Sequence, residues 1–221
     1  MNVALLSAAA RKANPYIDLL CGGLAEAGIA VTLVQEPGED GLPAAARQAD
    51  LIHLHWLELW GRPSYISLAG LARWGEPGRG VRRWLEPALN GAPRFDRRRQ
   101  RFLERFFTAL AEYKARGGRL VYTVHNLAQH EGEGGEVEAA AMRRLLGLAD
   151  GLHVHAAYMA DKVRRIQPVP TIAVIPHGHY IDAYPNTVSR ADARRALNLP
   201  LTVHHSPSTI YLFLGLIRPY K

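Results

Sequence analysis

The feature that most constrains the fold of this chain is a series of short apolar runs separated by polar or helical sequence. The runs are rich in Val, Ile and Leu and do not alternate strictly with polar residues, which is typical of strands buried on both faces of a parallel sheet. We therefore predict strands at residues 2–6, 30–34, 50–54, 120–124, 152–155 and 172–175.

Stretches between these runs have the periodicity of amphipathic helices. The clearest is 97–116, where Phe102, Phe106, Leu110 and Tyr113 recur every three or four residues and a Gly pair follows. Helices are also expected at 16–27 and 136–148. The alternation of strands and helices predicts an α/β fold with a Rossmann-like, doubly wound parallel sheet.

Polar side chains follow the first and third predicted strands, at the sheet edge where ligands bind in such folds. Arg11 and Lys12 suit a phosphate-bearing acceptor, or equally an exposed basic loop, and Asn14 follows them as a candidate acceptor contact. After the third strand, Trp56 can stack on a sugar ring, and Glu58 can bind hydroxyls or act as a base. Packing is the equal alternative for this last pair.

The fourth predicted strand is followed by a second polar group. His125 and Asn126 come directly after it, and His130 and Glu131 follow five residues later. We expect His125 to be functional and the other three to be candidate contacts to an acceptor.

Positive charge is concentrated in one segment. The chain has a net charge of +7, and residues 62–101 alone hold ten Arg against three acidic residues, interspersed with Trp74 and Trp84. Basic residues interleaved with Trp suit anionic phospholipid or a lipid-pyrophosphate acceptor. Nucleic acid is the runner-up on charge alone, although we expect no such partner. A solvated basic helical insertion is the alternative of equal weight.

The compartment is indicated by two features. No apolar run approaches the roughly 18–20 residues that a membrane-spanning helix needs. The single cysteine, Cys21, cannot form an internal disulfide, which points to a reducing setting. We therefore expect a cytoplasmic protein, peripheral on the inner face of the membrane if the basic segment binds lipid.

The last part of the sequence has a different character. Residues 182–186 resemble a turn-rich linker, and Ser189 with Asp192 resembles the start of a short helix. The run 210–214 looks like the first strand of a new unit. We expect a truncated piece of a longer protein, with an N-terminal domain at 1–182 that contains a basic insertion at 61–101, a linker at 183–209 and the start of a second domain at 210–221.

Five segments, in this order and spacing, resemble the family-4-type (group 1) glycosyltransferases of GT-B fold. DLIHLHW at 50–56 resembles the family's third strand, and GRLVYTVHN at 118–126 resembles its T-x-H strand end. ADGLHVH at 149–155 resembles the strand before the linker, and IPHG at 175–178 resembles the Pro-(Asn/His)-Gly turn. GLIRPYK at 215–221 resembles the start of the donor-binding domain.

The resemblance implies transfer of a sugar from a nucleotide-sugar to a glycan or lipid-linked acceptor, with retention of anomeric configuration and without a metal or other cofactor. His125 matches the family histidine near the transfer centre. Arg218 and Lys221 match basic residues that neutralise the donor diphosphate, although their spacing here is shorter than usual. Because the donor domain is expected to be missing, we predict that the 221-residue piece is inactive alone.

Ten histidines raise the alternative of a metal site. His53/His55 and His153/His155 are i, i+2 pairs, which on a strand point to the same face. A metal site needs further convergent ligands, for which the candidates are Glu58, His130 and Glu131, and we expect no metal. Two other functions stay open: a non-catalytic acceptor- or membrane-binding module and, less favoured, a metal-dependent hydrolase.

Overall fold

A single parallel sheet organises the chain. The computed structural model describes residues 1–8, 15–60, 66, 68–89, 91–127, 135–169, 171–181, 183–185 and 187–199. The strands are β1 (Asn2–Leu6), β2 (Ala30–Val34), β3 (Leu51–His55), β4 (Arg119–Val124), β5 (Gly151–Val154) and β6 (Ile172–Val174). They are all parallel in the order β2-β1-β3-β4-β5-β6, which confirms the predicted fold class.

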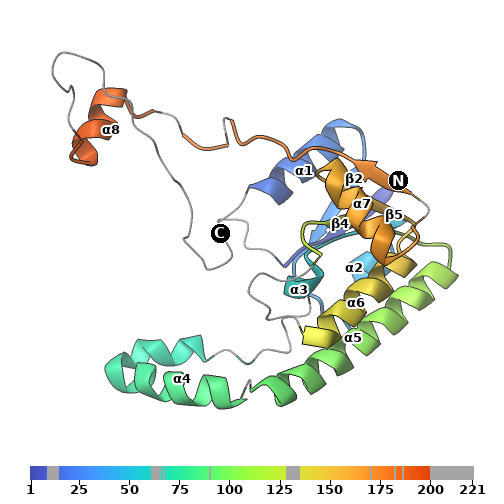
Figure 1. Cartoon of the computed structure of the whole chain (residues 1–221), viewed down its shortest axis with the longest axis horizontal. Coiled ribbons are helices and arrows are strands. Elements are labelled where there is room, and N and C mark those ends of the chain that lie inside the picture. Colours follow the sequence, from blue (N-terminus) through green and yellow to red (C-terminus); the bar gives the residue numbers. More distant parts are fainter. Residues whose placement is uncertain are drawn as a thin grey trace. The chain divides into compact units, whose positions relative to one another are not determined.

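The helices are connections between successive strands (Figure 1). They are α1 (Tyr16–Glu26), α2 (Ala44–Arg47), α3 (Leu57–Trp60), the 3-10 helix η3 (Ala69–Trp74), α4 (Gly75–Leu89), α5 (Ala92–Ala115), α6 (Gly135–Leu148) and α7 (Ala157–Ile166). The predicted helix at 97–116 begins earlier, because Pro93 fits the first turn of α5.

One face of the sheet builds the apolar core. Side chains at even-numbered positions of β1, β3, β4 and β5 pack against Ala46 of α2, Phe106 of α5, Leu145 of α6 and Val163 of α7. Figure 1 shows α5 and α6 side by side in this layer. The strand residues involved are Ala4, Leu6, Ile52, Leu54, Leu120, Tyr122, Val124, Leu152 and Val154.

The opposite face carries the odd-numbered residues and meets α1. The connection from β1 to β2 runs across the sheet in the opposite direction from the later ones, so a right-handed crossover places α1 on the other side. Accordingly Leu5 and Ile17 are buried but lie outside the main core cluster. Histidines occupy this odd-numbered face, as described below.

A buried arginine joins α3, α5 and α6. Arg99 of α5 is 1% exposed and forms an ion pair with Glu138 of α6 at 3.0 Å. Its guanidinium also donates to the carbonyl oxygens of Leu57 and Glu58 at the start of α3, at 3.4 and 3.3 Å. Arg99 was counted in the basic segment, but its role is to fix the helix layer and not to face solvent.

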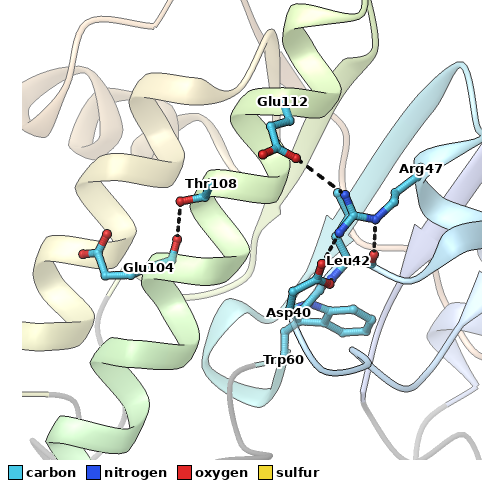
Figure 2. Close-up of polar contacts among 8 residues, drawn as sticks. Asp40, Leu42, Arg47, Trp60, Glu104, Thr108 and Glu112 are labelled. Carbon is cyan, nitrogen blue, oxygen red and sulfur yellow. Dashed lines mark hydrogen bonds and ion pairs between the residues drawn. The ribbon is translucent and has the colours of Figure 1, made fainter.

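The loop after β2 is fixed by polar contacts from α2, α3 and α5 (Figure 2). Arg47 pairs with Asp40, donates to the carbonyl oxygen of Leu42 at 2.8 Å and lies 3.9 Å from the carboxylate of Glu112. The indole N–H of the buried Trp60 donates to the carbonyl oxygen of Gly41 at 2.9 Å. This loop therefore holds the element that follows β3.

Backbone contacts divide the chain into Met1–Gly178 and His179–Lys221. Within the second unit, α8 (Arg190–Ala196) begins as predicted, because the Asp192 N–H donates to the Ser189 hydroxyl at 3.1 Å. The predicted strand at 210–214 lies outside the described residues. Within the described part of the chain, no helix has both the length and the apolarity to cross a membrane.

Candidate active site

The candidate site lies where the parallel strands end. The order of the sheet reverses direction between β1 and β3, and in open α/β sheets ligands bind beyond the carboxyl ends of the strands near that point. His55 is the last residue of β3, His125 follows β4 and His155 follows β5. The topology thus brings three histidines to one edge.

The register of the strands places more polar groups beside them. His53, Thr123 and His153 lie on neighbouring strands and share the odd-numbered face. His53 Nε2 lies 2.8 Å from Thr123 Oγ1, which lies 3.1 Å from His153 Nδ1. His53 also lies against His55, with ring centroids 4.3 Å apart, so the predicted same-face pairing is confirmed.

The series of side-chain hydrogen bonds from His53 through Thr123 to His153 ends on the backbone after β6. His153 Nε2 lies 3.1 Å from the carbonyl oxygen of Ile175, and His155 Nδ1 lies 3.2 Å from the same atom. A carbonyl oxygen accepts only, so His153 Nε2 and His155 Nδ1 each carry a proton. His153 Nδ1 is then an acceptor for the Thr123 hydroxyl, which accepts in turn from His53.

His53, His55, His125, His153 and His155 form one group, called here the histidine cluster, and His125 lies at its centre. Its Nε2 is 3.1 Å from Nδ1 of the fully buried His55. Its ring stacks on the indole of Trp56, with centroids 3.9 Å apart and planes within 9°. Trp56 adopts a left-handed backbone, with φ at 47°. Such strain costs on the order of 1–3 kcal/mol and gathers at functional sites.

Tyr16 closes the cluster from the first turn of α1. Its ring is 7% exposed and lies 5.3 Å from His125 between centroids. It also contacts the rings of His55, Trp56 and His155, at 5.7, 5.9 and 5.7 Å. Tyr16 therefore covers the cluster on the α1 side.

The histidines of the cluster are neutral at physiological pH. Burial lowers the pKa of His125 to about 3, and charge repulsion from His155 acts in the same direction. Burial also lowers the pKa of His53 to about 4, and it lowers the pKa values of His55, His153 and His155. A neutral imidazole has one N–H and one lone pair, so the cluster can both donate and accept hydrogen bonds without carrying charge.

The structure brings only some of the predicted site residues to this place. Trp56 lies against His125, and the half-buried Asn126 follows it directly in the chain. Glu58 lies in the first turn of α3. Burial and then the charge of Glu58 raise the pKa of Tyr122, which faces the apolar core. The predicted contact of Glu58 with an acceptor stays a prediction.

The remaining predicted residues lie outside the described part of the chain: Arg11, Lys12, Asn14, His130, Glu131, Arg218 and Lys221. Conversely, sequence reasoning gave no role to Tyr16 or Thr123. Tyr16 could have been found because it opens the helix after β1, and Thr123 because parallel pairing aligns it with His55 and His153.

The cluster does not have the arrangement of a metal centre. Among the residues that the structure describes, no three His, Cys, Asp or Glu side chains converge on one point that a metal ion could occupy. The ring nitrogens of His53 and His153 that face Thr123 are used in hydrogen bonds, His53 as donor and His153 as acceptor. The arrangement suits hydrogen bonding to a polar, uncharged ligand.

Comparison with known proteins places the chain in a family. A search of curated proteins finds no match. A family model described as Glycosyltransferase Family 4 matches residues 13–183, a span that contains the five strands from β2 to β6 and the whole histidine cluster. The protein is therefore a member of glycosyltransferase family 4, and its parallel sheet is the N-terminal domain of a GT-B fold.

Proposed function

We propose that this glycosyltransferase transfers a sugar from a nucleotide-sugar to a hydroxyl of a glycan or lipid-linked acceptor, with retention of anomeric configuration. The observation that carries the proposal is the neutral His125, held between Trp56 and His55 at the carboxyl edge of a family-4 sheet. In this reaction the bond from the anomeric carbon to the diphosphate breaks. A bond to the acceptor oxygen forms, and the acceptor hydroxyl gives up its proton to an oxygen of the departing diphosphate.

The burial of His55 indicates which nitrogen of His125 faces the substrate. If His125 Nε2 donated to His55 Nδ1, the other nitrogen of His55 would be a buried N–H with no partner among the described residues, and such groups are rare. If instead His55 Nδ1 donates to His125 Nε2, the proton of the neutral His125 ring lies on its Nδ1. We infer that this N–H donates to an oxygen of the transferred sugar and orients it for attack.

The other predicted residues have supporting roles in the proposal. Trp56 fixes the ring of His125 by stacking, and Glu58 and Asn126 contact the acceptor. Arg11, Lys12, Asn14, His130 and Glu131 complete the acceptor side. Arg218 and Lys221 stabilise the charge that develops on the leaving diphosphate. No cofactor takes part, and the inactivity of residues 1–221 alone stays a prediction.

A panel of nucleotide-sugars tests the reaction class. The full-length protein should release a nucleoside diphosphate from one donor in the presence of membrane-extracted or glycan acceptors. Proton NMR of the first product formed should show the donor's anomeric configuration. An inverted product would contradict retention, and absence of transfer from every donor would contradict the proposed class.

A second proposal concerns the surface of α4, which we propose rests on anionic membrane. Val81, Trp84 and Leu85 recur at helical spacing and are 47, 80 and 47% exposed, and Trp74 just before α4 is 66% exposed. In Figure 1, α4 lies at the end of α5 away from the strands. An exposed apolar stripe with two Trp is typical of helices that lie at a membrane interface.

Charge supports an anionic lipid as the partner. Arg79 and Arg83 are exposed on α4, and Arg97 and Arg101 are exposed on α5. Each basic residue near an anionic bilayer contributes about 1 kcal/mol. Such a surface would hold the enzyme near a lipid-linked acceptor.

Vesicle sedimentation tests this second proposal. The protein should bind phosphatidylcholine vesicles that contain phosphatidylglycerol, and Trp84→Ser or removal of charge at the exposed Arg79, Arg83, Arg97 and Arg101 should weaken binding at least several-fold. Tyr158→Ser, which changes an exposed aromatic on α7, is the matched control and should have no effect. Equal binding by all variants would overturn the proposal.

A further inference from the structure

The hydrogen bonds of His155 fix which of its nitrogens is free to accept. Its Nδ1 faces the carbonyl oxygen of Ile175 at 3.2 Å and must carry the proton. Because burial keeps this imidazole neutral by lowering its pKa, Nε2 has a lone pair. The tautomer of His155 is thus set by the backbone after β6.

That lone pair meets no donor within the described structure. His155 Nε2 is buried and has no hydrogen-bond partner among the described residues, and the same holds for Nε2 of His55. An unsatisfied buried acceptor costs about 1–3 kcal/mol. Both rings flank His125, with centroids 5.4 Å away for His55 and 5.3 Å away for His155. The two unmet acceptors therefore lie within the site and not in the remote core.

We propose that His155 is a specificity-determining residue whose Nε2 accepts a hydrogen bond from a sugar hydroxyl of the substrate bound at His125. The inference rests on the proposed sugar transfer and adds to it the class of group that is recognised: an uncharged O–H donor. The oxygens of an ionised phosphodiester or carboxylate have no proton to give and would repel the lone pair. The histidine cluster thus selects a neutral part of the substrate.

Two further rings pack against His155. The exposed His177 ring lies 4.9 Å from His155 between centroids, on the segment after β6. The buried Tyr16 ring lies on the same side, with its centroid 5.7 Å from His155 and 5.0 Å from His177. Because Nε2 of His155 is buried, the proposal requires one of these side chains to shift when a substrate hydroxyl binds.

Nitrogen-15 NMR of the full chain with labelled histidine tests the proposal directly. The His155 signals, assigned by their loss in His155→Gln, should show a proton on Nδ1 and a bare Nε2. Titration with methyl glucoside, mannoside and galactoside should shift Nε2 of His155 towards a hydrogen-bonded value with at least one of them, and acetate, which is ionised and has no O–H, should not. His179, which is exposed, should not shift.

Four NMR results would overturn the proposal. They are a proton on Nε2, a response to acetate alone, no response to any glycoside, and an Nε2 that is already hydrogen-bonded without a probe. The last result would assign the atom to an ordered water.

Matched variants separate recognition from structure. His155→Gln keeps an acceptor near the Nε2 position, so glycoside affinity should stay within about threefold, whereas His155→Leu should weaken it by about tenfold. Equal affinity in the two variants would contradict the proposal, provided that both unfold cooperatively like the parent. Transfer by the full-length enzyme is measured separately. It would survive a failed His155 proposal, and its absence would leave the NMR result interpretable.

Discussion

Gly28 and Gly41 share a left-handed backbone, at φ of 76° and 82°, but differ in what surrounds them. A Cβ on Gly28 meets nothing within 4 Å, whereas a Cβ on Gly41 would lie 2.9 Å from Phe106 and 3.1 Å from Phe102. We expect Gly28→Ala to lower the free energy of unfolding by about 1 kcal/mol through backbone strain alone. Gly41→Ala should lower it by about 3 kcal/mol, since overpacking adds to the strain.

Urea unfolding of both glycine variants measures this difference. Gly28→Ala is the matched control, because it introduces the same strain without the clash. Equal losses in the two variants would show that the loop after β2 does not pack on α5 as described.

At the scale of elements, two ion pairs join the same helices in different surroundings. Arg99 and Glu138 form a buried pair between α5 and α6, and Arg144 and Glu104 form an exposed one. Glu138→Gln should lower the free energy of unfolding by about 3 kcal/mol, because it leaves a buried guanidinium without its counter-charge. Glu104→Gln should cost less than about 1 kcal/mol. Denaturant unfolding in low and high salt checks both values, and similar costs would contradict the structural role of Arg99.

The strands were the part of the fold that the sequence predicted best. The first two, at 2–6 and 30–34, match the observed bounds, and the third is displaced by one residue. β3 extends to His55 because this residue pairs with Thr123 of β4. Asp50 precedes the strand, and its carboxylate accepts a hydrogen bond from the Asn2 N–H at 2.7 Å. Such an end depends on a neighbouring strand and is invisible to local patterning. The helix α7 was not predicted, because its buried face includes only Ala160 and Val163.

The site could be predicted only in outline. The rule that ligands bind at strand ends located His125 and Trp56, because it needs only the order of elements. The stacking of these two rings and the series of hydrogen bonds through Thr123 depend on strand order and register. A single sequence does not state which strands are neighbours, so these contacts could not be derived from it.

At the scale of the whole molecule, neutral buried histidines predict a loss of stability in mild acid. His53 has a pKa of about 4 when folded, against 6.5 for the free side chain, and His125 about 3. Between the lower pKa of each folded histidine and the 6.5 of the unfolded side chain, the unfolded chain binds more protons than the folded one. The free energy of unfolding therefore falls as the pH falls. The contribution is complete above about pH 6.5 and is lost progressively as the pH drops through 4. For His53 alone the loss is on the order of 3 kcal/mol.

Unfolding measured from pH 7.5 down to pH 5 isolates this effect, because most carboxylates titrate below that range. His53→Asn, which cannot titrate, should flatten part of the slope. Stability that does not change between pH 7 and pH 5 would mean that the histidines are not buried as described.

The most direct test of the central claim is sugar transfer by the full-length enzyme with His125 replaced by Ala. If the neutral His125 orients the transferred sugar, His125→Ala should reduce kcat by about 100-fold or more, as loss of a transition-state hydrogen bond does. Its circular dichroism and unfolding transition should stay close to those of the parent. Arg143→Ala, on the exposed side of α6, is the control and should transfer normally. Near-normal transfer by a folded His125→Ala enzyme would place the chemistry elsewhere and contradict the account.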